Sequence, residues 1–335
     1  MHTWDALLEG MEQGSERAVA RLITRIENRE PGWLEVLKTL HRGSRNARIV
    51  GITGSPGAGK STLTNQLART LVGKGKRVGV IAVDPSSPFS GGAILGDRAR
   101  MNELNTLDGV FVRSMATRGA LGGMCLAARD VVRVLDAAGY DFILIETVGV
   151  GQDEVEIVRA ADVVIVVCVP GNGDGLQAIK AGIMEIADLF VVNKADRDGA
   201  ELVVADIEGM LDLGTSGYRP PVLRTVATTG EGIEPLEHAL GECLGARTSD
   251  REWQLARVKE EVASLIQQQV TALFRKRVLD DAALDHAAAE ILAGNANPYS
   301  VVQEALAVLV DLFGEEQLPQ TGPNTRCATR TRKAG

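Results

Sequence analysis

Hydrophobic residues change their spacing along the chain twice, near residue 45 and again near residue 247. Before the first change they recur every three or four residues, as on the buried face of amphipathic helices. Between the two changes, short β-branched runs alternate with helical stretches, and beyond the second change helical spacing returns. The pattern predicts an N-terminal helical extension over residues 1–45, a central domain over 46–246 and a C-terminal helical segment over 247–315. Residues 316–335 lack periodicity and are expected to be disordered.

Six runs of the central domain are apolar at consecutive positions, as in strands that are buried on both faces. They are RIVGITG, RVGVIAVD, DFILIETVG, ADVVIVVCVP, DLFVVNKAD and PVLRTVATTG. Strands of this kind lie in a parallel sheet whose two faces are both covered by helices. The central domain is therefore predicted to have an α/β fold with a mostly parallel central sheet.

Charge and composition exclude several classes of partner. The formal net charge of −8 argues against a surface that binds a nucleic-acid backbone, so no nucleic acid is expected. The longest apolar run, residues 163–169, is far shorter than the roughly 20 residues needed to cross a bilayer, so no membrane span is expected. The N-terminus shows no basic region followed by an apolar stretch, and the four cysteines are dispersed without a CxxC pair. These features predict a cytoplasmic protein with reduced thiols.

A glycine-rich turn follows the first of the six runs and precedes a helix-forming stretch. This turn, GSPGAGKS over residues 54–61, lies where a phosphate-binding Walker A motif must lie, between a strand and a helix. Its backbone N–H groups can surround phosphates, Lys60 can reach the β- and γ-phosphates, and Ser61 can offer its hydroxyl to Mg²⁺. A P-loop NTPase fold is expected, and the alternative is a glycine-rich turn without ligand. The predicted nucleotide contacts are Gly54, Ser55, Pro56, Gly57, Ala58, Gly59, Lys60, Ser61 and Thr62.

Acidic residues stand at or beyond the ends of two further runs, where side chains face the ligand crevice of an open α/β sheet. Glu146 is the predicted acid that holds Mg²⁺ through water. Gly149 is predicted to contact the γ-phosphate through its amide, at the start of a switch segment. Asp84 and Asp97 are candidate further carboxylates around the metal, although Asp97 is equally well explained as a helix cap.

The tetrapeptide Asn193-Lys194-Ala195-Asp196 follows another strand-like run and matches the guanine-recognition motif NKxD. A carboxylate at Asp196 can accept hydrogen bonds from N1–H and the exocyclic amine of guanine, and adenine lacks that pair of donors. Asn193 can bond to the base or to a neighbouring loop, and the aliphatic stem of Lys194 can cover the ring. The sequence therefore predicts GTP and GDP as ligands, with a helix cap as the alternative for this tetrapeptide.

The residue that positions the attacking water is not fixed by the sequence. Gln152 is a candidate, although it lies three residues after Gly149 and a surface glutamine explains it as well. Arg113 and Arg118 are candidates for neutralising phosphate charge and are equally well explained as solvated arginines. Slow intrinsic hydrolysis that a partner accelerates is expected.

With these motifs placed, the sequence resembles the MeaB/ArgK group, the methylmalonyl-CoA mutase-associated GTPase family. The similar segments are TGSPGAGKST, VDPSSPFSGGAILGDRARM, ETVGVGQDE, PGNGDGLQAIKAGIMEIAD and NKAD, and both helical extensions match in position and length. The resemblance implies a chaperone whose GTP hydrolysis gates adenosylcobalamin loading into an acyl-CoA mutase such as methylmalonyl-CoA mutase and protects that enzyme. It also implies a homodimer formed through the C-terminal helices. A DxHxxG cobalamin motif is absent, so the cofactor is expected on the partner.

The resemblance further implies a third switch that responds to the partner and includes Gln177 and Lys180. Residues 171–175, GNGDG, hold three glycines, a composition suited to a loop with two conformations. Lys180 follows this loop within two helical turns, and a solvated lysine is the alternative reading. Gly175 stands where the family usually has an acidic side chain. This departure bears on the coupling of GTP hydrolysis to the partner and not on nucleotide binding.

Three other functions remain open from the sequence. A metallochaperone GTPase of the nickel-insertion class would need a His- or Cys-bearing metal site, and the four His and four Cys residues are dispersed. An ATP-dependent kinase linked to basic amino-acid transport would leave the NKAD motif without a role. A scaffold that binds GTP without useful hydrolysis would differ in single-turnover kinetics alone.

Overall fold

The computed structural model describes residues 3–84, 104, 106–116, 123–147, 161–171, 186–213 and 218–315. Cα packing divides the chain into two compact units, Met1–Leu255 and Ala256–Gly335. Among the described residues, no helix is long and apolar enough to cross a membrane.

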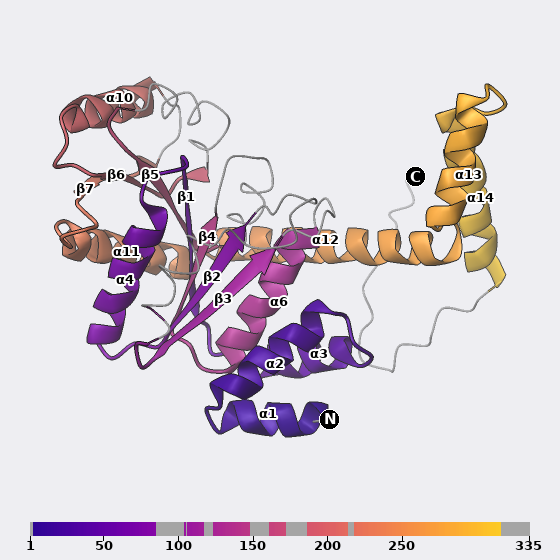
Figure 1. Cartoon of the computed structure of the whole chain (residues 1–335), viewed down its shortest axis with the longest axis horizontal. Helices are drawn as coiled ribbons and strands as arrows, with labels where there is room; N and C mark the ends of the chain where they lie inside the picture. The colour runs from indigo at the N-terminus through magenta and orange to yellow at the C-terminus, as the bar shows by residue number, and fades with distance from the viewer. Residues whose placement is uncertain are drawn as a thin grey trace, which may run out of the picture. The chain divides into compact units, whose positions relative to one another are not determined.

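A seven-stranded parallel sheet forms the centre of the first unit (Figure 1). Its strand order is β3-β2-β4-β1-β5-β6-β7, which confirms the predicted α/β fold. The strands are β1 (Arg48–Gly54), β2 (Val78–Asp84), β3 (Val110–Ala116), β4 (Phe142–Thr147), β5 (Val163–Cys168), β6 (Leu189–Asn193) and β7 (Val222–Thr225).

The sequence pattern missed β3, which pairs only with β2 at one edge of the sheet. Strands at an edge are not buried on both faces, so they lack a continuous apolar run. Arg113 and Ser114 interrupt this strand, and Ser114 is exposed. Sequence reasoning based on consecutive apolar residues therefore overlooks this strand, although it finds the strand at the opposite edge, β7.

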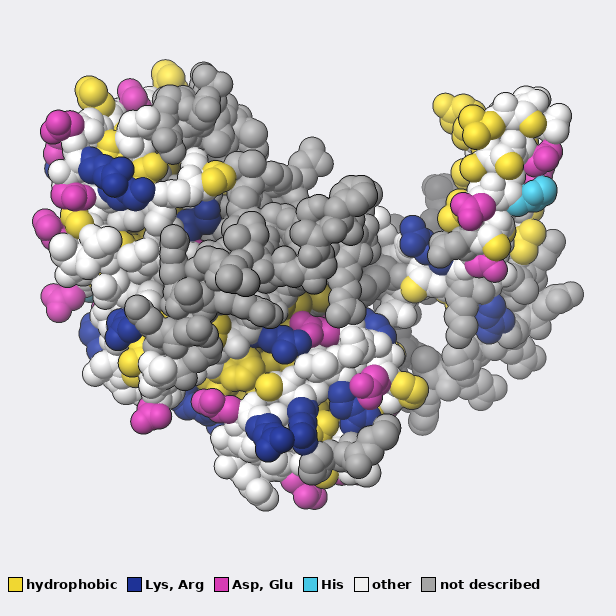
Figure 2. All heavy atoms as spheres, in the orientation of Figure 1, with side chains coloured by type: hydrophobic (Ala, Val, Ile, Leu, Met, Phe, Trp, Pro, Cys, Tyr) yellow, Lys and Arg dark blue, Asp and Glu magenta, His cyan; other side chains and the backbone are white. Residues whose placement is uncertain are grey.

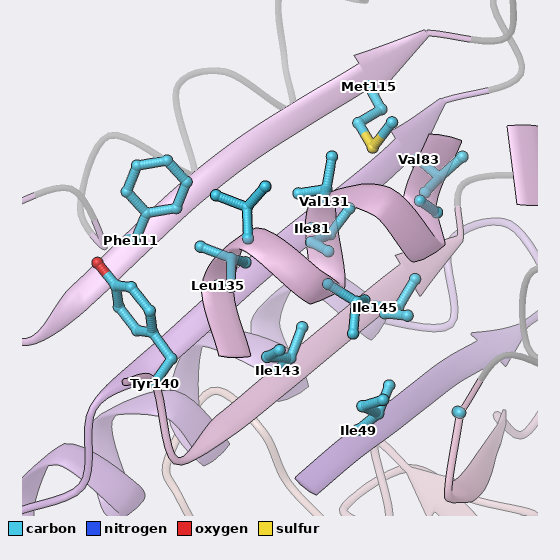
Figure 3. Packing of buried hydrophobic residues seen from close by; sticks show 14 of the residues in the cluster. Ile49, Ile81, Val83, Phe111, Met115, Val131, Leu135, Tyr140, Ile143 and Ile145 are labelled. Atoms are coloured by element: carbon cyan, nitrogen blue, oxygen red, sulfur yellow. The ribbon is translucent and has the colours of Figure 1, made fainter. Parts of the chain in front are cut away.

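Helices cover both faces of the sheet, as its alternating side chains require. On one face, α4 (Lys60–Gly73) and α11 (Ile233–Ser249) bury their leucines against one set of strand residues. On the other face lie α6 (Gly123–Ala137) and α10 (Ala200–Leu213). Figure 3 shows this second core at α6, where Val131 and Leu135 contact the isoleucines of β2 and β4. α11 continues past residue 246, where the sequence placed the end of the central domain.

The N-terminal extension consists of α1 (Trp4–Glu12), α2 (Glu16–Glu27) and α3 (Trp33–Arg42). α2 and α3 pack on α6, and apolar residues of this extension, among them Leu22 and Ile26, are buried. Two ion pairs reinforce this packing: Arg29 with Asp130 of α6 at 2.6 Å, and Arg113 of β3 with Glu27. Arg113 therefore holds the extension to the sheet, and its candidacy as a phosphate-neutralising arginine was wrong.

Three helices follow α11: α12 (Arg251–Arg277), α13 (Asp281–Leu292) and α14 (Pro298–Glu315). The chain breaks between α13 and α14, and there the Asn297 side chain accepts the backbone N–H groups of Tyr299 and Ser300. Hydrophobic side chains are exposed on these helices, and those of α13 and α14 are visible in Figure 2.

Candidate nucleotide-binding site

The glycine-rich turn connects the end of β1 to the start of α4, at the carboxyl edge of the sheet (Figure 1). Gly59 adopts φ 86° and immediately precedes the first residue of α4. A Cβ at this position would lie 2.5 Å from Nδ2 of Asn193, so only glycine fits between the turn and the end of β6. The geometry provides the strand, turn and helix N-terminus that phosphate binding requires.

Lys60 lies inside the turn and is 6% exposed. Its Nζ donates to the carbonyl oxygens of Gly54, at 2.7 Å, and Ser55, at 3.1 Å. Buried ammonium groups need such acceptors, because an unpaired charge away from water is costly. The ammonium is thus held at the concave side of the turn by groups that a phosphate oxygen could replace.

Ser61 and Glu146 meet across the β1–β4 pair. Glu146 lies beside Ile52 in the parallel register, and the Ser61 hydroxyl donates to Oε1 of Glu146 at 2.5 Å. The Glu146 side chain is 2% exposed. Serine hydroxyl and carboxylate oxygens are hard ligands of the kind Mg²⁺ prefers, so this buried pair fits a magnesium ion. Asp84 ends β2 at the same edge of the sheet, and its side chain lies outside what the structure describes.

Asn193 connects the base-recognition motif to the glycine-rich turn. Its side-chain amide donates to the carbonyl oxygen of Ala58 at 2.8 Å, and its Oδ1 accepts from the Thr225 hydroxyl and from the backbone N–H of Ala227, both at 3.1 Å. Lys194, at φ 57°, donates from Nζ to the carbonyl oxygen of Gly57 at 2.7 Å. Asp196 is exposed, and no described residue bonds to its carboxylate.

Thr225 and Ala227 belong to a segment to which the sequence assigned no role. They lie at the end of β7 and just beyond it, next to β6 in the sheet. In a parallel sheet the carboxyl ends of neighbouring strands share one edge. The position of Thr225 and Ala227 at the end of a strand-like run was therefore the one sequence signal that could have placed them near the site. The two residues fix the Asn193 amide and with it the distance between the turn and the base motif.

The structure brings residues 54–62, Glu146 and residues 193–196 to one edge of the sheet. Other predicted site residues lie outside the described residues: Asp97, Gly149, Gln152, Gln177 and Lys180, together with Arg118 and Gly175. At the neighbouring end of β5, burial raises the pKa of the Cys168 thiol to about 12, which favours the protonated thiol at neutral pH.

Comparison with known proteins adds the family. The family model described as methylmalonyl Co-A mutase-associated GTPase MeaB matches residues 19–282. The chain belongs to this family. Members are GTPases associated with methylmalonyl-CoA mutase, so this MeaB-family chain is a P-loop GTPase that binds guanine nucleotide.

Relatives extend over most of the chain. A protein named as a GTPase from Pyrococcus horikoshii is 50% identical over 274 residues, 79% of this chain and 86% of its own length. The GTPase ArgK of Escherichia coli is 38% identical, with 77% and 81% covered. The mitochondrial methylmalonic aciduria type A homolog of Mus musculus is 34% identical, with 86% and 78% covered. A crystal structure named LAO/AO transport system kinase superposes with a TM-score of 0.69 at 27% identity, covering 92% of this chain and 98% of that one.

Proposed function

We propose that this GTPase hydrolyses GTP to GDP and phosphate with Mg²⁺ and that turnover gates adenosylcobalamin loading into, and protection of, an acyl-CoA mutase such as methylmalonyl-CoA mutase. The observation that supports the nucleotide site most directly is the pair of hydrogen bonds from Asn193 and Lys194 to the carbonyls of Ala58 and Gly57. These bonds hold the guanine motif against the phosphate turn. One guanine nucleotide can therefore contact both.

The phosphates bind in the turn over residues 54–62. Backbone N–H groups at the start of α4 point toward a ligand there, and the helix dipole adds partial positive charge. Lys60 exchanges its carbonyl partners, Gly54 and Ser55, for β- and γ-phosphate oxygens. This exchange leaves a buried cation paired with an anion, which makes phosphate binding favourable.

Ser61 and Glu146 hold the magnesium ion, Glu146 through water, and Asp84 and Asp97 are further carboxylates for it. A bound Mg²⁺ would supply positive charge that offsets the negative charge developing on the phosphate oxygens. The Ser61–Glu146 hydrogen bond keeps both oxygens in place before the ion arrives. Gly149 contacts the γ-phosphate, and Gln152 positions the attacking water.

Guanine is recognised by Asp196, whose exposed carboxylate is available for N1–H and the exocyclic amine of the base. The stem of Lys194 covers the ring, and Asn193 maintains the loop. Adenine offers no matching donors, so ATP binds more weakly by a large factor.

Hydrolysis is coupled to the partner through the third switch, with Gln177 and Lys180. The support is the family's association with the mutase together with the glycine-rich loop ahead of Lys180. Under this proposal Lys180→Ala keeps intrinsic hydrolysis within a few-fold of wild type and loses most of the acceleration by mutase. Turnover measured with and without mutase checks this, and equal stimulation of both proteins would remove Lys180 from the coupling.

The partner is tested by pull-down from native lysate, with the chain loaded with GDP or with a non-hydrolysable GTP analogue. We expect a cobalamin-dependent acyl-CoA mutase, retained differently by the two nucleotide states. The captured mutase should then accelerate GTP turnover by the wild-type chain. Absence of any such mutase from both eluates, with GTP hydrolysis intact, would reject the partner while leaving the GTPase activity in place.

A further inference from the structure

A small basic hollow lies at the amino edge of the sheet, opposite the nucleotide site. The first residues of β1, β2 and β4 meet there, since Arg48 and Val78 both lie beside Phe142 in the strand register. The hollow has a volume of about 250 Å³. Its lining comprises Arg45, Asn46, Ala47, Arg48, Lys76, Gly139, Tyr140, Asp141 and Phe142.

The connection from α3 to β1 is held in a fixed shape beside this hollow. The Asp136 carboxylate of α6 accepts the backbone N–H groups of Arg45 and Ala47 and the hydroxyl of Ser44. Asn46, between two of these anchored residues, adopts φ 62°. These contacts fix the backbone of Arg45 and with it the direction in which its side chain leaves the chain.

Gly139, at φ 84°, is part of the lining and makes room for Arg45, and Arg77 approaches the same glycine from outside the lining. A Cβ at this position would lie 2.5 Å from Nη1 of Arg45 and 3.4 Å from Nη1 of Arg77. Arg77 is fixed by donation to the carbonyl of Ala138 at 2.8 Å and by its place over the Tyr140 ring, 4.4 Å from the centroid. Two guanidinium groups therefore lie beside the same glycine, and like charges so close repel each other.

Ion pairs do not neutralise this charge, although the Asp136 carboxylate lies beside the hollow. Of the acids among the described residues, none lies within ion-pair distance of Arg45, Arg48 or Lys76. Asp141 is the one acid in the lining, and its Oδ2 accepts the backbone N–H of Arg77. The whole chain carries a net charge of −8, so acids are abundant elsewhere. An anion in the hollow would reduce this repulsion and pair with Arg45, Arg48 and Lys76 at once.

We propose that this hollow binds a phosphate or diphosphate group, free or carried on a larger small molecule. Guanidinium groups match phosphate oxygens in two-point hydrogen bonds, and Lys76 supplies a further point charge. The volume is below the roughly 300–1,000 Å³ of pockets that enclose a whole small ligand, so the hollow takes the anionic group and leaves the rest of the ligand outside.

The test uses the full chain with its nucleotide site saturated by a non-hydrolysable GTP analogue, which fills the β- and γ-phosphate positions, so that added anion cannot enter the turn at residues 54–62. Inorganic phosphate, inorganic diphosphate and an acidic peptide are titrated separately by calorimetry, without added magnesium so that diphosphate stays free. The test variant is Arg45→Ala with Lys76→Ala. The matched control, Arg251→Ala with Lys259→Ala, removes the same charge from exposed positions of α12.

We expect one saturable diphosphate site in the wild type and in the control, and affinity lower by about tenfold or more in the test variant, as the loss of charge-assisted hydrogen bonds predicts. Stronger binding of phosphate than of diphosphate would identify a single-phosphate site and support the same proposal. The proposal is overturned by an absent or non-saturable site in the wild type, by equal affinity in the test variant, or by tighter binding of the acidic peptide, which would indicate a protein-docking surface.

A second measurement keeps the proposal testable if the variant fails to fold. Lys76 of the wild type is acetylated with a lysine-reactive ester, with and without diphosphate, and followed by mass spectrometry. Bound anion should slow modification of Lys76 and leave Lys259 unaffected. Equal modification of Lys76 in both samples would overturn the proposal.

Discussion

At the scale of single residues, the candidate site separates groups that hold the loops from groups left free for ligand. Asn193 uses its amide donor and its oxygen within the protein, to Ala58, Thr225 and Ala227. Asp196, three residues later, is exposed and makes no bond to a described residue. One residue of the motif therefore maintains the loops, and the other is available to select the base.

Asp196→Asn should weaken GTP binding and improve binding of xanthosine triphosphate. Xanthine presents a carbonyl where guanine presents the exocyclic amine, and an amide at residue 196 can donate to that carbonyl. The ratio of GTP affinity to xanthosine triphosphate affinity should fall by on the order of 100-fold or more. The reason is that a polar group of guanine is left unpaired in the variant. Competition binding with both triphosphates measures it, and a variant that still prefers guanine would place base recognition outside this motif.

Glu146→Gln should retain GTP and lose magnesium-dependent hydrolysis. The amide oxygen can still accept from Ser61, so the buried hydrogen bond and the fold survive, whereas the negative charge for the cation is lost. We expect turnover to fall on the order of 100-fold or more. Single-turnover kinetics over a magnesium titration checks this, with nucleotide affinity measured in parallel. Unchanged hydrolysis would shift the role to another carboxylate, with Asp84 the first to test.

Much of this residue-scale picture follows from the sequence, because the turn, Glu146 and the NKAD tetrapeptide each stand at the end of a recognisable apolar run. The contribution of Thr225 and Ala227 could not be predicted in the same way. Their role is to bond to Asn193, and that depends on β7 lying beside β6. Adjacency of strands is a property of the sheet and not of any local spacing.

At the scale of elements, the N-terminal helices are held on the central domain by apolar packing and by two ion pairs whose side chains differ in exposure. Periodicity predicted these helices and their buried residues, but it could not show which surface they cover. α6 and β3 supply that surface: the pair Arg29–Asp130 joins residues 101 positions apart, and the pair Arg113–Glu27 joins residues 86 positions apart. Asp130 is 4% exposed, so its charge depends on the partners it has there.

Arg29→Met should destabilise the chain at pH 7 by on the order of 2 kcal/mol, because it leaves the Asp130 carboxylate buried with only Arg133 nearby, at 3.5 Å. A double-mutant cycle with Asp130→Asn isolates the pair from the contact of Arg29 with the Trp33 ring. The control cycle removes Lys38 and Glu35, an exposed pair on α3, and should show coupling below about 0.5 kcal/mol. Urea unfolding gives each value, and equal coupling in the two cycles would contradict the prediction.

The same variant should respond to pH in a defined direction. Burial raises the pKa of Asp130 above its ordinary value of 3.8, although Arg29 opposes the shift. Without Arg29 the folded-state pKa rises further. As pH falls from 7 toward 5, the folded chain then takes up a proton that the unfolded chain does not, so the variant regains stability relative to wild type. A difference in unfolding free energy that is constant or larger at pH 5 would show that Asp130 is not the group left unpaired.

At the scale of the whole molecule, the second unit exposes apolar side chains that one chain leaves uncovered. On α12, Val258, Val262, Ile266, Val270 and Leu273 are spaced three or four residues apart, so they form one stripe along the helix. Their exposed fractions run from 36% to 58%. Tyr299, Val302 and Leu306 add exposed apolar surface on α14. Contiguous apolar surface of this kind marks an interface, and a second copy of the chain is the occupant we propose.

Val262→Glu combined with Ile266→Glu in the full chain should therefore convert a homodimer into a monomer that still binds GTP. Dimerisation would then bury two carboxylates in the interface, and the free-energy cost of burying them exceeds what the apolar contacts contributed. Thr271→Glu is the matched control, since Thr271 is exposed on the opposite side of α12 and a charge there should leave the dimer intact. Truncation after Leu255 removes the second unit and should give the same monomer while keeping Arg247, whose guanidinium pairs with Asp188, the residue before β6. Sedimentation at micromolar concentration, with GTP affinity as the test of folding, decides among these outcomes. A wild-type chain that sediments as a monomer, or a double variant that remains dimeric, would exclude the α12 stripe as the contact between copies.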